Sequence, residues 1–381
     1  MKTFKRLYPR IHKFENLYRA FLKARKGTLA PALRSGASAG ERNRPDVAAF
    51  EFNLEFELPR LQEELAAETY RPSPYRHFTL YERKPRRISA ALFCDRVVHH
   101  ALCRLIEPIW EARFVRDSYA CRAGKGTHAA LDRCTYFARR YPFALQGDIV
   151  QFFPSVDHAV LYDLLARRVV CQPTLRLVRL IIASGAGVHT DNWEVQWFSG
   201  DDLFAALRPR GLPIGNQTSQ FWANVYLHEL DKFVKQTLRC PAYLRYCDDF
   251  ALFADDKPTL HRWRREIEDF LVSLRLKLHP RKTTVSPVKV GLPFLGFLVF
   301  PDHRRLRRDN GVYFERRFRR MLAEYAAGAI SRAQMDVSVQ GWIAHAAHGD
   351  TWGLRGSVFG RYTLPRQGVQ RETITDIHQE L

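Results

Sequence analysis

The chain has 381 residues, of which 46% are hydrophobic. This length suits two or three domains, and this composition excludes a chain that is disordered throughout. Lys and Arg number 60 against 40 Asp and Glu, which gives a formal charge of +20. The charge predicts a polyanionic partner, and it favours nucleic acid over a membrane because no amphipathic stretch gathers Lys and Arg on one face. A merely basic surface on a soluble protein is the alternative.

Signals for targeting and for structural metals are missing from the sequence. The opening stretch MKTFKRLYPRIHKF lacks the apolar segment of a secretory signal, and no run of about 18 apolar residues occurs. Seven cysteines, an odd number without C-x-x-C spacing, argue against zinc and against a disulfide framework. We therefore expect a cytoplasmic protein in a reducing compartment, without a membrane partner.

The first part of the chain is predicted to be mainly helical. Residues 11–26 place apolar side chains at helical spacing, and the small residues that follow predict a mobile loop over 27–46. Helical periodicity returns over 52–70 and over 95–114. Between these two helices, FTLYERKPRRISA (78–90) predicts a basic hairpin.

Strands and helices alternate in the rest of the chain. The apolar run YPFALQGDIVQFF (141–153) predicts a strand that reaches Asp148. The later segments are a polar, Trp-containing stretch at 184–210, a buried helix at 217–234, a hairpin at 243–254, an amphipathic helix at 256–276, a strand pair at 291–300, and basic helices without strand signal after about Arg304.

Two adjacent aspartates, Asp248 and Asp249, stand at the predicted turn of LRYCDDFALF. Ionised neighbours repel, and an unpaired buried carboxylate is costly, so such a pair calls for a counter-charge. Phosphoryl transfer to a sugar hydroxyl uses divalent ions held by carboxylates, and Asp148 could supply a third ligand from a neighbouring strand. Mg²⁺, which prefers oxygen ligands, is the expected ion. A solvated turn is the alternative for an isolated Asp-Asp pair.

The motifs around these aspartates resemble those of prokaryotic, group II intron-like reverse transcriptases. YCDD is similar to the Y-x-D-D signature of that family, GDIVQFFPSVDH to its first palm motif, and GLPIGNQTSQFWANVYL to the motif under the incoming nucleotide. RPSPYRHFTLYERKPRRISAALFCDRVVHHAL and FVRDSYACRAGKGTHAAL resemble its fingers motifs, and LKLHPRKTTV and GLPFLGF its last palm motifs. The order is that of the family, over about residues 60 to 300.

The resemblance implies an α+β fold of the right-hand type, with fingers, an antiparallel palm sheet and a helical thumb. The implied domains are a basic helical extension at 1–60, fingers at 61–145, a palm at 146–303 with an insertion at about 184–210, and a thumb with a C-terminal tail at 304–381. The implied activity is that of an RNA-directed DNA polymerase, acting on template RNA, RNA–DNA hybrid and dNTPs.

The sequence PIGNQTSQ, preceded by GDDLF, further resembles the polymerases of diversity-generating retroelements. Those enzymes copy a template-repeat RNA with errors at adenines, and they commonly work with a small, basic accessory oligomer. Retron-like or anti-phage reverse transcriptases are the alternative within the enzyme class. A catalytically idle palm that serves as an RNA-binding scaffold is the alternative outside it, although all three aspartates are present.

The resemblance also assigns roles to individual residues. Catalysis is assigned to Asp148, Asp248 and Asp249, and two Mg²⁺ ions, for which Mn²⁺ can substitute, to Asp148, Ile149, Asp248 and Asp249. The predicted nucleotide-binding residues are Lys84, Arg86, Arg87, Phe153, Ile214, Gly215 and Lys282, with Phe153 as a steric gate against a 2′-hydroxyl and Ile214 as the fidelity residue. The predicted template or hybrid contacts are Arg122, Asn216 and Gln220. Core packing for Phe153 and Ile214, and solvated surface for the basic residues, are the alternatives. His99 and His100, on an apolar helix, are expected to be core or surface residues rather than ligands.

Overall fold

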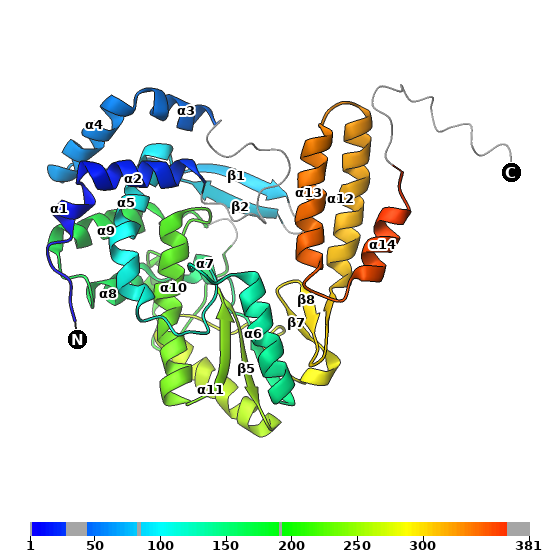
Figure 1. Cartoon of the computed structure of the whole chain (residues 1–381). Helices are drawn as coiled ribbons and strands as arrows, with labels where there is room; N and C mark the ends of the chain where they lie inside the picture. Colours follow the sequence, from blue (N-terminus) through cyan, green and yellow to red (C-terminus); the bar gives the residue numbers. More distant parts are fainter. Residues whose placement is uncertain (1, 28–43, 82–84, 190–192, 364–381) are drawn as a thin grey trace. The chain divides into compact units, whose positions relative to one another are not determined.

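The computed structural model describes residues 2–27, 44–81, 85–189 and 193–363. This part of the chain forms two compact units, of which the first extends to Val290 and the second begins at Gly291 (Figure 1). Most of the predicted loop at 27–46 and the end of the predicted tail, 364–381, lie outside the described residues. The loop prediction is wrong at its end, because Pro45 opens helix α3 (Pro45–Phe52), where a proline at the first position is favourable.

The N-terminal helices of the first unit pack on one long buried helix. They are α1 (Tyr8–Ile11), α2 (Phe14–Arg25), α3 and α4 (Leu54–Ala66), and they surround α5 (Phe93–Glu111). Phe21 of α2 meets Phe93 of α5 edge to face, with ring centroids 6.1 Å apart. His99 and His100 lie inside α5, each 1% exposed. The structure places both side chains in the core, one of the two environments expected for them.

The basic hairpin is confirmed as β1 (Arg76–Tyr81) and β2 (Pro85–Ala90), which pair antiparallel with Arg86 opposite Leu80 and Ile88 opposite Phe78. The residues at its tip, 82–84, lie outside the described chain. Lys84, a predicted nucleotide contact, is one of them.

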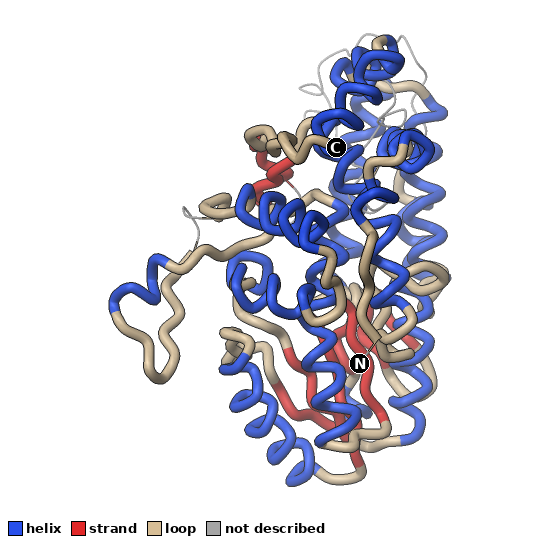
Figure 2. The backbone as a smooth tube through the Cα atoms, turned by 90° about the vertical axis from the view of Figure 1, so that its left-hand side faces the viewer, coloured by secondary structure: helices blue, strands red, loops and turns tan. Residues whose placement is uncertain are grey.

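A four-stranded antiparallel sheet forms the second half of the first unit. Its order is β4 (Ala242–Tyr246), β5 (Asp249–Ala254), β3 (Phe143–Gly147) and β6 (Thr284–Pro287). Helix α11 (Lys257–Ser273) packs on β3, β5 and β6, and α6 (Thr127–Arg140) packs on β4 (Figure 1). In Figure 2 the strands of this sheet are the red segments in the lower half, with helices running beside them.

The other elements of this unit connect and cover the sheet. They are α7 (Phe152–Ser155), α8 (His158–Ala166), α9 (Gln172–Ser184), the 3-10 helix η4 (Leu203–Leu207), α10 (Gln217–Lys232), the π-helical turn η5 (Phe233–Thr237) and the 3-10 turn η6 (Val288–Val290). The strand predicted to reach Asp148 ends one residue earlier, at Gly147, and Phe152 and Phe153 are helical.

The second unit combines a small sheet with helices. The predicted strand pair is confirmed as β7 (Leu292–Phe294) and β8 (Phe297–Val299), and β9 (Arg304–Leu306) adds a third strand where none was expected. Helices α12 (Arg308–Ala326), α13 (Arg332–Ala346) and α14 (Trp352–Gly360) follow. Phe314 of α12 and Trp342 of α13 stack with ring centroids 3.9 Å apart, which seals the core of this unit.

The whole is a mixed helix and sheet protein, as the predicted α+β class requires. None of the helices in the described ranges combines the length and the apolar content that crossing a membrane demands.

Candidate active site

The turn of the β4–β5 hairpin carries Asp248 and Asp249. Tyr246 pairs with Asp249 across the hairpin, and Cys247 turns the chain with a positive φ of 57°. On the other side of β5, Gly147 of β3 pairs with Phe250. Asp148 follows Gly147 directly, so the ends of two neighbouring antiparallel strands bring the three aspartates to one edge of the sheet.

Gly147 is required at this edge because the Phe250 ring covers it. A Cβ atom built on Gly147 would lie 2.2 Å from the ring of Phe250, closer than any real contact. A side chain here would push β3 and β5 apart beside Asp148. The glycine before the aspartate thus has a packing reason of its own.

The three carboxylates influence one another strongly. Although Asp249 is exposed as a residue, withdrawal of its carboxyl group from water, followed by the charges of Asp248 and Asp148, raises its pKa to about 7. Burial, and then the charge of Asp148, also raise the pKa of Asp248. The site is therefore short of positive charge.

Lys282 supplies part of the missing charge. Its ammonium Nζ lies 2.5 Å from Oδ2 of Asp148, and its charge opposes the rise in the pKa of both Asp248 and Asp249. The segment that carries it is held in place by the bond from the His279 N–H to the Asp148 carbonyl, at 2.7 Å. The structure thus brings Lys282, predicted near the nucleotide, to the aspartate cluster.

A divalent cation fits these residues by chemistry. Carboxylate oxygens are the donors that Mg²⁺ prefers, and the raised pKa of Asp249 reflects charge that a cation would neutralise. Over the described part of the chain, no three His, Cys, Asp or Glu side chains are already arranged as a metal cluster. Ile149, the other predicted ligand residue, is 2% exposed and pairs with Leu278 in an isolated antiparallel bridge.

The motif predicted to lie under the incoming nucleotide, residues 211–227, is called the floor motif below, and it is attached to the β1–β2 hairpin. The backbone carbonyl of Ile214 accepts a hydrogen bond from the Ser89 N–H at 3.1 Å, and the side chain of Ile214 is half-buried. Gly215 has a φ of 116°, and a Cβ there would lie 3.0 Å from Ile88. Both the backbone angle and the contact favour glycine at this position.

Asn216 belongs to the same attachment, and its side chain is buried instead of lying at the surface. It is 2% exposed, its Oδ1 accepts from the Ala91 N–H at 3.1 Å, and its Nδ2 donates to the Ser89 carbonyl at 3.0 Å. Its amide oxygen and its amide nitrogen each bond to the backbone at the end of the β1–β2 hairpin, so this buried residue has a structural role, and its template contact stays a prediction. Gln220, on the first turns of α10, is half-buried, and its template contact stays a prediction.

Arg122 also turns inward. Its side chain is 6% exposed and forms an ion pair with Glu111 at 2.7 Å. Its Nη1 donates to the carbonyls of Val115 and Ser118, at 2.7 and 2.9 Å. This burial and these partners contradict the predicted template contact, because the guanidinium holds the loop before α6 and does not face solvent.

Arg86 and Arg87 are consecutive in β2, so their side chains leave the strand on opposite faces. Arg86 shares the face of Ile88, which contacts the glycine of the floor motif, and Arg87 is on the other. The two arginines, which were predicted as one group, therefore do not grip one ligand from the same face.

Phe153 and Phe152 of α7 differ in burial. Phe152 is 2% exposed and its ring meets Tyr226 of α10, whereas Phe153 is half-buried. The carbonyl of Phe153 accepts from the N–H of Leu212, the second residue of the floor motif, at 2.8 Å. The role of Phe153 as a steric gate stays a prediction.

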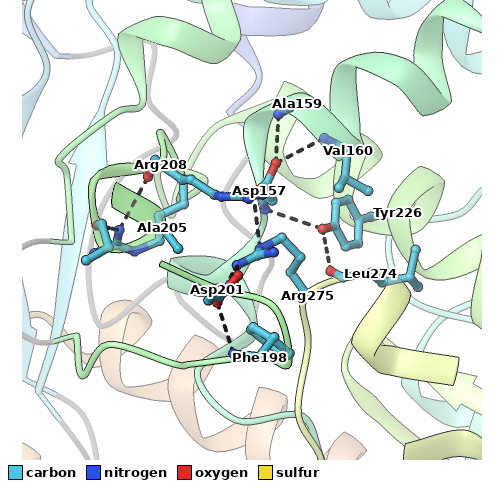
Figure 3. Close-up of polar contacts among 12 residues, drawn as sticks. Asp157, Ala159, Val160, Phe198, Asp201, Ala205, Arg208, Tyr226, Leu274 and Arg275 are labelled. Carbon is cyan, nitrogen blue, oxygen red and sulfur yellow. Dashed lines mark hydrogen bonds and ion pairs between the residues drawn. The ribbon is translucent and has the colours of Figure 1, made fainter. Parts of the chain in front are cut away.

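The polar stretch before the floor motif is anchored on the sheet domain by charges that sequence reasoning missed. Figure 3 shows Arg275 between two aspartates: it meets Asp201 of this stretch at 2.6 Å and Asp157 at 3.7 Å. Asp157 also caps α8 by accepting from the Ala159 and Val160 N–H groups. No periodic pattern could have revealed these pairs, because their members lie far apart in sequence.

Comparison with known proteins agrees with the geometry. The family model for reverse transcriptase (RNA-dependent DNA polymerase) matches residues 80–299, more than half of the chain. Protein YkfC of Escherichia coli (strain K12) is 27% identical over 327 residues, 74% of this chain and 81% of that protein. The group II intron-encoded protein LtrA of Lactococcus lactis subsp. cremoris is 27% identical over 228 residues, 58% of this chain but only 36% of LtrA. Nuclear intron maturase 1, mitochondrial, of Arabidopsis thaliana is 32% identical over 87 residues, 23% of this chain and 12% of that protein.

The chain therefore belongs to the reverse transcriptase family, and it is a group II-like member. It is an RNA-directed DNA polymerase. Reverse transcriptases act on template RNA and dNTPs and generally use divalent ions, typically Mg²⁺.

Proposed function

We propose that this polymerase serves a diversity-generating retroelement and makes error-prone cDNA from a template-repeat RNA. The observation that carries the proposal is Ile214. Most enzymes of the family that the motifs resemble carry a glutamine before this glycine, whereas this chain has an apolar side chain, half-buried beside the β1–β2 hairpin. A glutamine there could hydrogen-bond near the sugar and make the reaction sensitive to pair geometry, whereas isoleucine offers only contact area.

We further propose that Asp148, Asp248 and Asp249, with Ile149 beside them, hold two Mg²⁺ ions. Bound there, the ions would stabilise the attacking and leaving oxygens of nucleotidyl transfer. Lys282, paired with Asp148 at 2.5 Å, keeps that carboxylate compensated. The ammonium is then next to the phosphates of a bound nucleotide, which it can attract as a point charge.

The fingers, palm and thumb of the right-hand layout supply the nucleic-acid site in this proposal. Arg86 is exposed on the hairpin face of Ile88 and is available to a triphosphate, while Arg87 is directed elsewhere. The excess of 60 Lys and Arg over 40 Asp and Glu suits the backbone of an RNA–DNA hybrid. A small basic accessory oligomer is the proposed protein partner.

Copying one RNA template with wild-type and Ile214→Gln proteins, and sequencing both cDNAs, tests the retroelement branch. One hydrogen bond contributes about 0.5–1.5 kcal/mol, so restoring it should lower the error frequency opposite adenine by several-fold to roughly tenfold. Errors opposite other bases should change less.

Ile214→Val is the matched control, because it keeps an apolar, branched side chain and should keep the error frequency. Equal adenine errors in wild-type and Ile214→Gln cDNA would remove Ile214 from the mechanism. Accurate copying by the wild type would instead assign the protein to the retron-like or anti-phage branch.

A further inference from the structure

Arg245 is a fully buried arginine in strand β4, with 0% of its side chain exposed. It forms a two-bond ion pair with Asp231 of α10: Nε donates to Oδ1 and Nη2 to Oδ2, both at 2.7 Å. Burying two charges costs desolvation energy that their attraction often fails to offset, so a buried pair is weak evidence of stabilisation. The remaining bonds of the guanidinium give a second reason for an arginine at this position.

All five N–H groups of the guanidinium have acceptors. Besides the two bonds to Asp231, Nη2 donates to Oγ of Ser118 at 3.1 Å and Nη1 to Oδ1 of Asn224 at 3.2 Å. The fifth bond runs from Nη1 to the backbone carbonyl of Cys247 at 2.9 Å. One rigid, planar group thus joins α10 and the segment before α6 to the turn that holds the aspartates.

The main chain of Arg245 is fixed as well. Its N–H donates to the carbonyl of Asp117 at 2.8 Å, and its carbonyl accepts from the N–H of Tyr119 at 2.9 Å. The backbone from which the guanidinium extends is therefore fixed, two residues before Cys247 of the turn.

Cys247 has a backbone conformation that needs stabilising contacts. Its φ of 57° lies in the left-handed region, which is disfavoured for a residue with a Cβ atom. Its carbonyl belongs to the planar peptide that continues into Asp248, so a bond to that oxygen restricts the orientation of the peptide plane. The direction in which Asp248 leaves the backbone follows from that plane.

We propose that Arg245 is a positioning residue that orients Asp248 through the Cys247 carbonyl. Its charge is neutralised by Asp231, so its effect on the site is geometric and not electrostatic. The inference rests on the proposed role of Asp248 in the reaction. Misplacing a reacting group by about 1 Å can slow an enzyme about a hundredfold.

The test compares Arg245→Lys with Tyr243→Phe. Lysine keeps the charge opposite Asp231 but has three donors in place of five, so it cannot also reach the turn. Tyr243→Phe is the matched control: it removes a buried hydrogen bond to Asp231 (2.6 Å) in the same strand without touching Cys247. For Arg245→Lys we expect kcat for dNTP incorporation to fall about 10- to 100-fold with KM changed less than about threefold. For Tyr243→Phe we expect both constants to stay near wild type.

A second readout does not depend on activity. In hydrogen exchange measured on the metal-free protein, amides of the turn between β4 and β5 should exchange faster in Arg245→Lys, while those of β3 stay protected. Should Arg245→Lys fail to fold, Asn224→Ala replaces it. This change removes one of the two acceptors of Nη1, the other being the Cys247 carbonyl, and so loosens the guanidinium without leaving a charge unpaired.

A kcat for Arg245→Lys equal to that of Tyr243→Phe, or unchanged exchange at the turn, would overturn the inference. The variant Asp248→Asn tests the proposed role of Asp248 in the reaction separately from the role of Arg245. If Asp248→Asn retained DNA synthesis, the role of Asp248 would fail even where the exchange data upheld the link between Arg245 and the turn.

Discussion

Asp249→Asn should make the metal-free protein more stable at alkaline pH while removing a predicted catalytic group. The carboxyl group of Asp249 has a pKa of about 7 in the folded protein against 3.8 when unperturbed. Between these values the folded state binds more protons than the unfolded state, so the free energy of unfolding falls as pH rises. Asparagine has no charge that folding would withdraw from water, so the variant does not lose this stability as pH rises.

The size of this stability difference follows from the pH range between 5 and the folded-state pKa of about 7. Two pKa units correspond to about 2.7 kcal/mol. Because Asp249 is exposed and solvent screens its neighbours, we halve this to about 1–1.5 kcal/mol. Asp249→Asn should therefore gain that much more stability over wild type at pH 8 than at pH 5.

Thermal unfolding in the presence of a chelator, at pH 5 and pH 8, measures the difference. Asp163→Asn, which removes an exposed carboxylate on α8 away from the cluster, is the control and should give the same small change at both pH values. A stabilisation by Asp249→Asn that is equal at the two pH values, or a destabilisation at pH 8, would refute the electrostatic coupling of the three aspartates.

Three further predictions concern other parts of the molecule. Phe153→Ala should admit ribonucleotides into the product because the ring occupies the space of a 2′-hydroxyl; an unchanged ratio of ribo- to deoxynucleotide incorporation would return Phe153 to a packing role. Binding to RNA should weaken steeply with salt, since each neutralised phosphate releases counterions, and a flat titration would count against binding through Lys and Arg. Burial lowers the pKa of His99 and His100 from 6.5 to about 3. As pH falls below 6.5 the unfolded state therefore gains protons first, and the free energy of unfolding should drop between these two pH values. His99→Leu should reduce this drop in acid unfolding measurements, and an unchanged pH dependence would contradict the prediction.

The sequence predicted those parts of the site that depend on local pattern. The β4–β5 hairpin, the strand before Asp148 and the basic hairpin follow from apolar runs and turn residues, and the structure confirms them. The Asp-Asp pair stands at the turn because the flanking strands fix where the chain reverses.

Other features depended on tertiary contacts and were therefore missed. Arg245 lies in a strand whose residues are buried on both faces, so alternation does not mark it as special. Asn216 and Arg122 looked like candidate contacts to nucleic acid, but both side chains turn inward. Asn216 bonds the Ser89 carbonyl, 127 residues away, and Arg122 pairs with Glu111, 11 residues away. The helix at Phe152 followed an apolar run that has no period to distinguish strand from helix.

The attachment of the floor motif to the fingers hairpin has a consequence for recombination between related polymerases. The bonds of Asn216 and Ile214 go to backbone N–H and C=O groups of Ser89 and Ala91. Every amino acid except proline, which lacks the N–H, has both groups. A hairpin of different sequence but equal geometry could therefore be transplanted without loss of the joint, whereas the asparagine, with one donor and one acceptor spaced to fit, could not be exchanged. Chimeras that inherit residues 85–91 from one parent and 213–217 from another should keep a working joint as long as both parents supply that one amide.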